Sequence, residues 1–305
     1  MLRNQWFAIE RSSVIRTRPV ALRRLGRPLV LWRDADAVLH GSFDACPHRG
    51  AALSRGRVVD GCLECPYHGL RFGPDGVCTE VPAHPDLDPS PWRLHPLVLR
   101  EHRGLVWWWH GEDEPGPLPW GDDLQERLDA SSPTQLDITD TFEVPWLRIM
   151  ENLTDIHHLP FVHRWTVPVP SAEVTAYTAE RRGDDLIVRG SLGDLEASMH
   201  LRGPCFGILD FGVAAFAVCV TPIDEEHTWL FARYGQRVIQ LPLLRPVATW
   251  LLGTFDYRLL QRFQDLPTWQ SQRLPDPADI GRYRLFAADE GVRLYFEAYG
   301  EWSCR

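Results

Sequence analysis

The chain has 305 residues, 44% of them hydrophobic, and a formal net charge of −9. This length can bury a large core and suggests two domains, and the composition is that of an ordinary globular protein. The acidic balance without a basic tract argues against a nucleic-acid partner, and no run of about 18 apolar residues predicts a membrane-spanning helix. Seven irregularly spaced cysteines predict no disulfide framework, so we expect a protein of the reducing cytoplasm.

Residues 1–110 are predicted to be rich in β-structure. Short apolar or alternating runs bounded by turn residues indicate strands at residues 28–32, 77–81, 97–99 and 105–109. Asp75-Gly76 precedes the second of these runs as a hairpin signal. The three consecutive tryptophans at 107–109 are expected in the core. The pattern therefore predicts an all-β N-terminal domain.

Two Cys/His pairs dominate this first domain: Cys46-Pro-His48 and, after sixteen intervening residues, Cys65-Pro-Tyr-His68. Together they supply two thiolates and two imidazoles. In a Rieske [2Fe–2S] centre the thiolates hold one iron and the histidines hold the other. Neutral histidines place less negative charge on the cluster than thiolates would, so the reduction potential rises. The four residues are therefore predicted to bind a Rieske cluster.

A structural zinc site is the alternative, because two cysteines and two histidines also complete a tetrahedral zinc shell. Cys62 supports this alternative, since Cys62-Leu-Glu-Cys65 is itself a Cys-x-x-Cys pair. Common zinc modules group their cysteines together and their histidines together, whereas each segment here supplies one of each. The spacing therefore favours the iron–sulfur cluster and makes Cys62 an ordinary strand residue.

A stretch rich in proline, glycine and acidic residues, from 111 to 133, predicts the crossing between two domains. We place the boundary so that residues 1–115 form the cluster domain and residues 116–305 form the second domain. Alternating segments predict strands at 134–143, 173–188 and 205–234, and helices are expected at 243–266 and 285–297. Strands around one long helix indicate an α+β domain with an antiparallel sheet and an internal cavity.

The segment after residue 147 contains a second candidate metal site. Asp155 and His158 are three residues apart, which places them on one face of a helix, and Pro160 disrupts that helix so that His163 can turn back toward the same point. Two histidines and one carboxylate form the facial triad that non-haem Fe(II) uses for oxygen chemistry. His157 is the rival to His158, but its spacing from Asp155 is less suitable.

The pattern Asn152-x-x-Asp155-x-x-His158-x4-His163, joined to the Cys/His pairs upstream, resembles the Rieske non-haem iron oxygenases. It is most similar to their vanillate O-demethylase and dicamba monooxygenase branch. The resemblance implies a helix-grip-like second domain, with His158 and His163 as iron ligands and Asn152 near the iron without ligating it. It also implies a homotrimer, in which Asp155 bridges His158 to a cluster histidine of the neighbouring subunit.

The third iron ligand implied by the resemblance is an aspartate on a late helix, often in a Phe-x-Glu-Asp setting. Phe286-Ala-Ala-Asp289 matches this placement, with Ala288 where the family has glutamate. We therefore predict Asp289 as the third ligand. The alternatives are other late acidic residues, namely Glu290, Asp279 and Glu297.

The resemblance implies the terminal oxygenase of a multicomponent system with two cofactors, a Rieske [2Fe–2S] cluster and a mononuclear Fe(II). The chain contains no G-x-G-x-x-G fingerprint between a strand and a helix. Electrons are therefore expected from a separate NAD(P)H-dependent reductase, with or without a ferredoxin. O2 would then hydroxylate or oxidatively demethylate an organic, aromatic or polycyclic, substrate.

Three other activities are compatible with the sequence. The same iron site could perform cis-dihydroxylation or desaturation. A Rieske electron carrier fused to a ligand-binding domain is the non-enzymatic alternative, although such a carrier has no need of the residues at 155, 158 and 163. Iron analysis separates these classes, because an oxygenase holds three irons per chain and a carrier holds two.

Overall fold

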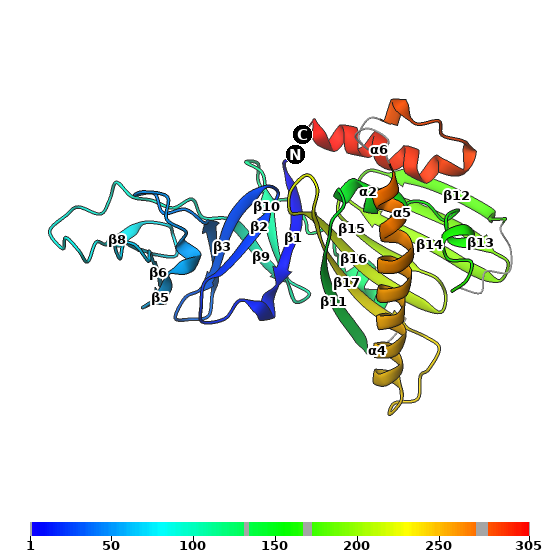
Figure 1. Cartoon of the computed structure of the whole chain (residues 1–305), viewed down its shortest axis with the longest axis horizontal. Helices are drawn as coiled ribbons and strands as arrows, with labels where there is room; N and C mark the ends of the chain where they lie inside the picture. Colours follow the sequence, from blue (N-terminus) through cyan, green and yellow to red (C-terminus); the bar gives the residue numbers. More distant parts are fainter. Residues whose placement is uncertain (1, 131–133, 167–172, 273–279, 305) are drawn as a thin grey trace. The chain divides into compact units, whose positions relative to one another are not determined.

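The computed structural model describes residues 2–130, 134–166, 173–272 and 280–304 (Figure 1). The chain divides into two compact units. One consists of residues 6–115, and the other of residues 1–5 and 116–305. Among the described residues, no helix has the length and apolar character needed to cross a membrane.

The unit at 6–115 is built from three small sheets and two single-turn helices. The strand orders are β1-β10-β9, β2-β3-β4 and β5-β6-β7-β8. The strands predicted near residues 28, 77, 97 and 105 are confirmed. The elements are β1 (Gln5–Arg11), η1 (Ser12–Val14), β2 (Val20–Arg24), β3 (Arg27–Arg33), β4 (Leu39–Phe43), η2 (Leu53–Arg55), β5 (Arg57–Val59), β6 (Cys62–Glu64), β7 (Arg71–Phe72), β8 (Cys78–Glu80), β9 (Val98–His102) and β10 (Leu105–His110).

The core of this unit explains the aromatic runs in the sequence. All three tryptophans at 107–109 are buried, as expected for core residues. A separate cluster of buried side chains contains Trp32 and Phe72 together with Cys46 and Cys65. The two cysteines of the Cys/His pairs are therefore part of a hydrophobic core, which fixes their positions.

The second unit contains one seven-stranded antiparallel sheet in the order β11-β17-β16-β15-β14-β13-β12. A tight turn joins two of the strands at residues 182–185, where Arg182 pairs with Asp185 across two residues and Gly183 adopts φ 63°. The strands are β11 (Gln135–Phe142), β12 (Thr175–Arg182), β13 (Asp185–Leu192), β14 (Leu195–Arg202), β15 (Phe206–Asp210), β16 (Ala214–Pro222) and β17 (Thr228–Gln236).

Helices of this unit lie against the sheet and carry the second motif. Figure 1 shows one long helical segment, drawn in orange, running across the sheet; it consists of α4 (Arg245–Phe255), the wide π-helical stretch η3 (Asp256–Asp265) and α5 (Leu266–Ser271). The antiparallel α+β architecture is thus as predicted. The other helical elements are α1 (Asp122–Asp129), α2 (Trp146–Leu153), α3 (Leu159–Val162), η4 (Ile280–Arg282), η5 (Ala287–Asp289) and α6 (Glu290–Ser303).

Close contact between the long helical segment and the sheet depends on Gly253. A Cβ at this position would lie 2.8 Å from Cδ1 of Tyr234 and 2.9 Å from Cδ2 of Leu136. Because glycine has no such atom, the end of α4 can approach β17 and β11 closely. This approach holds the start of η3 over the sheet.

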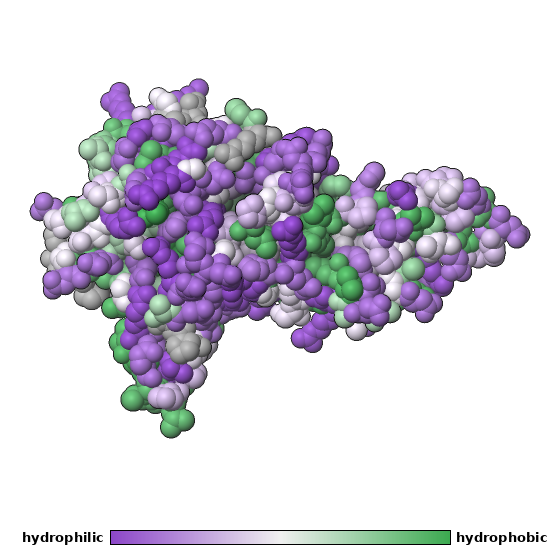
Figure 2. All heavy atoms as spheres, turned by 180° about the vertical axis from the view of Figure 1, so that it is seen from behind, coloured by the Kyte–Doolittle hydropathy of each residue, from purple (hydrophilic) through white to green (hydrophobic). Residues whose placement is uncertain are grey.

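Part of the surface near α4 is apolar. Figure 2 shows hydrophobic side chains gathered at the projecting end of this helix. Exposed apolar patches of this kind often mark surfaces that bind another molecule. The exposed large hydrophobic side chains between residues 238 and 251 are Val238, Ile239, Leu241, Leu243, Leu244, Val247, Trp250 and Leu251.

Candidate metal centres

The two Cys/His segments fold into loops with the same backbone pattern. In the loops at 46–51 and 65–70, the cysteine N–H donates to the carbonyl five residues later, at 2.8 Å in both. The glycine four residues after each cysteine donates to the cysteine carbonyl. Gly50 and Gly69 both adopt φ 76°, a conformation that favours glycine. The sequence therefore builds two matched loops, each presenting one cysteine and one histidine.

The side chains of these loops are arranged asymmetrically. Cys46 and Cys65 are buried, whereas His48 is exposed and His68 is half-buried. The two imidazole rings lie 4.8 Å apart between centroids. Burial of the thiol, together with the neighbouring thiol of Cys65, raises the pKa of Cys46 to about 11, so metal binding must displace this proton. Buried thiolates and outward histidines fit the two ends of a Rieske cluster.

The spacing of these four residues is too wide for a single zinc ion. A tetrahedral zinc with bonds of about 2.0 to 2.3 Å brings its ligand atoms to within about 3.8 Å of one another. Within the described ranges, the only group of three or more such residues with ligand atoms within 4.8 Å of one another is formed by His158, His163 and Asp265. A cluster of two bridged irons accommodates the wider spacing at the Cys/His loops.

The second motif lies in a turn between two helices rather than on one helix. α2 ends at Leu153, and the amides of Thr154 and Asp155 then donate to the carbonyls of Glu151 and Asn152. The expectation that Asp155 and His158 share one helical face is therefore wrong. Tight turns bring them together instead, because the Thr154 hydroxyl also bonds to the Glu151 carbonyl and ends the helix there.

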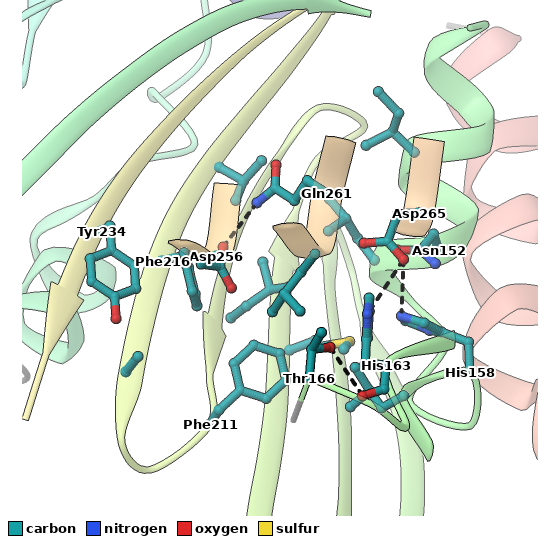
Figure 3. Close-up of a pocket in the computed structure, with 18 of the residues that line it drawn as sticks. Asn152, His158, His163, Thr166, Phe211, Phe216, Tyr234, Asp256, Gln261 and Asp265 are labelled. Carbon is teal, nitrogen blue, oxygen red and sulfur yellow. Dashed lines mark hydrogen bonds and ion pairs between the residues drawn. The ribbon is translucent and has the colours of Figure 1, made fainter. Parts of the chain in front are cut away.

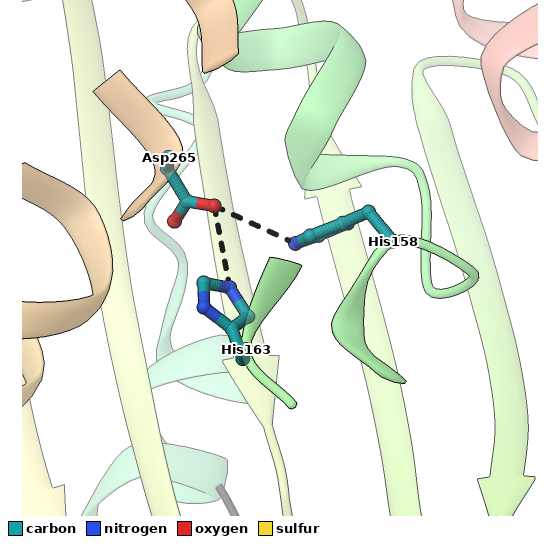
Figure 4. Close-up of side chains that lie close together, drawn as sticks. All are labelled: His158, His163 and Asp265. Carbon is teal, nitrogen blue, oxygen red and sulfur yellow. Dashed lines mark ion pairs between the residues drawn. The ribbon is translucent and has the colours of Figure 1, made fainter. Parts of the chain in front are cut away.

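The two histidines direct the same ring nitrogen toward one point. Nδ1 of His158 lies 2.8 Å from the backbone carbonyl of Asp155, and Nδ1 of His163 lies 2.7 Å from Oε1 of Gln264. Because carbonyl oxygens only accept, both Nδ1 atoms donate, and each Nε2 lone pair is left for a metal. Figure 4 shows the two Nε2 atoms facing Asp265.

Asp265 supplies the carboxylate at this point. Its Oδ1 lies 3.2 Å from Nε2 of His163 and 3.9 Å from Nε2 of His158. The residue is 6% exposed, and among the described residues Oδ1 has no hydrogen-bond donor. A buried carboxylate oxygen without a donor is costly. A ferrous ion between the three atoms removes that cost, since neighbouring ligands in an octahedral shell lie about 3 Å apart. The residues therefore fit mononuclear iron.

The structure brings Asp265, rather than the expected Asp289, to the two histidines. Asp289 is not part of the group formed by the histidines and Asp265. Its Oδ2 accepts a hydrogen bond from the backbone N–H of Phe286 at 2.9 Å, so Asp289 stabilises the start of η5. The alternatives Glu290 and Glu297 both pair with Arg293. Asp279 lies outside the described residues.

Helix geometry explains why Asp265 was missed. An α-helix turns 100° per residue, so residues nine apart lie on opposite faces. η3 has the wider π-helical hydrogen-bonding pattern and completes about two turns over the same distance. Asp256, Gln261 and Asp265 consequently face the same cavity. The sequence contains one indication of this carboxylate: Asp265 follows Phe263-Gln264 at the end of the helix predicted over 243–266.

The other motif residues lie around this centre. Asn152 lines the cavity beside the histidines without joining them. The carboxylate of Asp155 accepts a 2.7 Å hydrogen bond from the N–H of His157 and lies 3.7 Å from Nδ1 of His158. Burial alone would raise the pKa of Asp155, but hydrogen bonds from the two histidines lower it well below its usual range. His157 packs against Tyr177, away from the cavity.

The candidate iron site opens into a cavity of about 350 Å³, within the range of small-molecule sites. Figure 3 shows His158, His163 and Asp265 at one side of this space and Phe211, Phe216 and Asp256 across from them. Aliphatic and aromatic side chains form most of its wall. They are Ile149, Leu153, Leu159, Leu195, Met199, Leu209, Phe211, Val213, Ala214, Phe216, Val218, Leu230, Leu252, Phe255, Leu260 and Trp269.

Two aromatic residues close to the motif do not contribute to the cavity. Phe161 and Trp165 are 63% and 83% exposed. Neither residue therefore belongs to the core or to the cavity wall. Phe161 lies between the two histidines and Trp165 lies two residues after His163, and both side chains face outward from this unit.

Removing the hydrogen-bond partner of His163 should weaken metal binding without removing a proposed ligand. Gln264 accepts from Nδ1 of His163 and from the hydroxyl of Thr166 at 2.9 Å. In Gln264→Leu the ring loses the partner that fixes its tautomer, so we expect about 10- to 100-fold weaker iron affinity. Titration of the mononuclear site with Fe(II) measures this change. Unchanged affinity would contradict the role of Gln264.

Comparison with known proteins finds a known domain around the Cys/His loops. The family model of the Rieske [2Fe-2S] domain matches residues 5–91. Aminopyrrolnitrin oxygenase PrnD of Pseudomonas fluorescens is 32% identical over 68% of this chain and 56% of its own length. The oxygenase component of dicamba O-demethylase from Stenotrophomonas maltophilia is 30% identical over 66% of this chain and 57% of its own length. The chain thus spans little more than half of these relatives.

Solved structures share the fold of the whole chain. Dicamba monooxygenase bound to dicamba superposes with a TM-score of 0.81 at 20% identity, over 100% of this chain and 98% of that one. A mutant of NdmA from Pseudomonas putida CBB5 with theobromine gives a TM-score of 0.79 at 22% identity, over 99% and 93%. With its Rieske domain, its fold and its candidate iron site taken together, the chain belongs to the Rieske-domain oxygenase components.

Proposed function

We propose that this protein is the terminal oxygenase of a multicomponent system, which hydroxylates or oxidatively demethylates an aromatic substrate. One observation carries the proposal: His158, His163 and Asp265 converge in an apolar cavity of a chain that also contains a Rieske domain. Relatives named as a demethylase and an oxygenase support this chemistry over cis-dihydroxylation or desaturation. A simple electron carrier needs no second metal centre.

The residues assigned to the two centres follow from their placement. We propose Cys46, Cys65, His48 and His68 as the cluster ligands, and His158, His163 and Asp265 as the iron ligands. When bound, the cluster supplies single electrons and the ferrous ion supplies oxygen chemistry. The 1–115 and 116–305 segments would be the corresponding domains.

The protein's own side chains set the conditions for this reaction. The Asp155 carbonyl and Gln264 hold the two imidazoles in the tautomer that presents Nε2. Aromatic side chains such as Phe211, Phe216 and Trp269 bind a flat apolar molecule and exclude water from its surroundings.

We further propose that electrons come from a separate NAD(P)H-dependent reductase, with or without a ferredoxin. A homotrimer would place Asp155 between His158 of one subunit and a cluster histidine of the next. The seven free cysteines suit the cytoplasm, where thiols stay reduced.

Iron analysis and oxygen uptake test the proposal. Protein purified anaerobically with iron and sulfide should contain three irons per chain and show the Rieske spectrum on reduction. With a surrogate reductase and NADH, a panel of methoxy- and methylarenes should include compounds that stimulate oxygen uptake and yield hydroxylated or demethylated products. Two irons per chain and no uptake with any compound would instead favour the electron carrier.

A further inference from the structure

Asp256 places an acidic side chain in the largely apolar wall of the cavity. It is the first residue of η3, and apart from Asp265 it is the one carboxyl group among the described residues that line this space. Its neighbours in the wall are mainly hydrocarbon, including Phe216 and Leu252. An acidic side chain at this position therefore requires an explanation beyond packing.

The fold satisfies this carboxyl group only in part. Nε2 of Gln261 donates to Oδ2 of Asp256 at 3.3 Å, which is a long hydrogen bond. Within the described part of the chain, Asp256 forms no ion pair. Figure 3 shows its second oxygen pointing away from Gln261, on the side of the cavity where Phe211 and Phe216 lie. One oxygen thus remains for a ligand.

The electrostatic environment agrees with an incomplete site. Burial, and next the charge of Asp265, raise the pKa of Asp256 to about 7. A carboxyl group in this state gains from any hydrogen-bond donor that reaches it, because the donor stabilises the charged form. A purely structural aspartate would instead be fully bonded within the fold, as Asp137 is by Arg233 at 2.7 and 2.8 Å.

We infer that Asp256 is a specificity-determining residue, which accepts a hydrogen bond from an amino or hydroxyl group on the aromatic substrate. This inference rests on the proposed oxygenase function and narrows its substrate class. The apolar wall holds the ring, and Asp256 selects the donor. Asp256 and Asp265 are nine residues apart on one helix and face the same cavity. The substrate group that donates to Asp256 is therefore distinct from the substrate group that lies near the proposed iron ligands. When it is ionised, Asp256 also disfavours carboxylate-bearing arenes by like charge.

Equilibrium binding to matched bicyclic probes tests the inference. The probes are 2-naphthylamine, 2-naphthol, 2-methylnaphthalene and 2-naphthoate, which share a ring system and differ in one substituent. Equilibrium dialysis is performed anaerobically on the protein carrying both metal centres, without an electron donor, so no turnover occurs. We expect the amine, the alcohol or both to bind at least about tenfold more tightly than the methyl compound, and 2-naphthoate to bind most weakly.

Substitutions then assign the preference to Asp256. In Asp256→Leu the ratio between donor and methyl probes should fall to about one, and in Asp256→Asn the discrimination against 2-naphthoate should shrink. Glu225→Leu is the matched control, since Glu225 is exposed in the turn between β16 and β17 and lines no part of the cavity. Iron content and Tm verify folding, and Asp256→Asn serves alone if the leucine variant does not fold.

Two results would overturn the inference: equal affinity of the wild type for the donor and methyl probes, or a donor preference that survives in Asp256→Leu. Tighter binding of 2-naphthylamine would indicate an arylamine site, and tighter binding of 2-naphthol would indicate a phenol site. Because the measurement needs no oxygen chemistry, donor-selective binding without any oxygen uptake would contradict the proposed function while leaving this inference intact.

Discussion

Asp265→Ala is expected to lower the iron content from three to two atoms per chain and to abolish oxygen uptake. The substitution removes one of the three proposed ligands, so we expect turnover to fall more than about 100-fold. The Rieske spectrum should remain, because the cluster loops belong to the other unit. Metal analysis, the spectrum of the reduced protein and oxygen uptake measure the three effects.

Stability gives a second readout for the same variant. Oδ1 of Asp265 is buried without a hydrogen-bond donor among the described residues. Alanine removes this costly oxygen, so protein treated with a chelator should keep or gain thermal stability. Removal of a metal ligand should have this effect, whereas removal of a residue that stabilises the fold would lower Tm.

Asp289→Ala is the matched control because it removes the carboxylate first expected to bind iron. Its Oδ2 accepts from the N–H of Phe286. We expect three irons per chain, retained oxygen uptake and a loss of about 1 kcal/mol of stability, typical of a lost helix cap. Loss of iron in Asp289→Ala together with retention in Asp265→Ala would reverse the assignment.

The histidines could be selected from the sequence because their geometry is local. His158 and His163 lie five positions apart, with Pro160 among the four residues between them, so short turns suffice to direct them to one point. The Cys/His loops are local in the same sense, since each is closed by bonds between residues five positions apart. Where a site depends on such short segments, residue type and spacing predict it.

Asp265 depends on information that residue spacing does not carry. It meets His163 across about 100 residues, and its direction is set by the wide turns of η3. The alternation of apolar residues predicted the strands, and the run at 243–266 predicted a helix. No pattern indicated that ten residues of this helix would depart from the α-helical repeat. The side chains facing the cavity, Asp256 included, therefore became visible only in the structure.

Asp155→Asn should slow electron transfer to the iron while leaving both metal centres in place. Its carboxylate lies 3.7 Å from Nδ1 of His158, and its side chain is 25% exposed. It can therefore approach His158 on one side and, in the proposed homotrimer, a neighbouring subunit on the other. The hydrogen bonds that lower its pKa keep it charged across the neutral range.

Asparagine has nearly the same volume as aspartate but removes the negative charge and places a donor amide beside the histidines. We expect three irons per chain, an unchanged Rieske spectrum and at least about 100-fold slower reoxidation of the reduced cluster. Rapid mixing of the prereduced protein with O2 and a compound that stimulates wild-type oxygen uptake measures this rate. Glu225→Gln, at an exposed turn, should reoxidise like the wild type. If Asp155→Asn does so too, the electrons reach the iron by a route that does not involve this carboxylate.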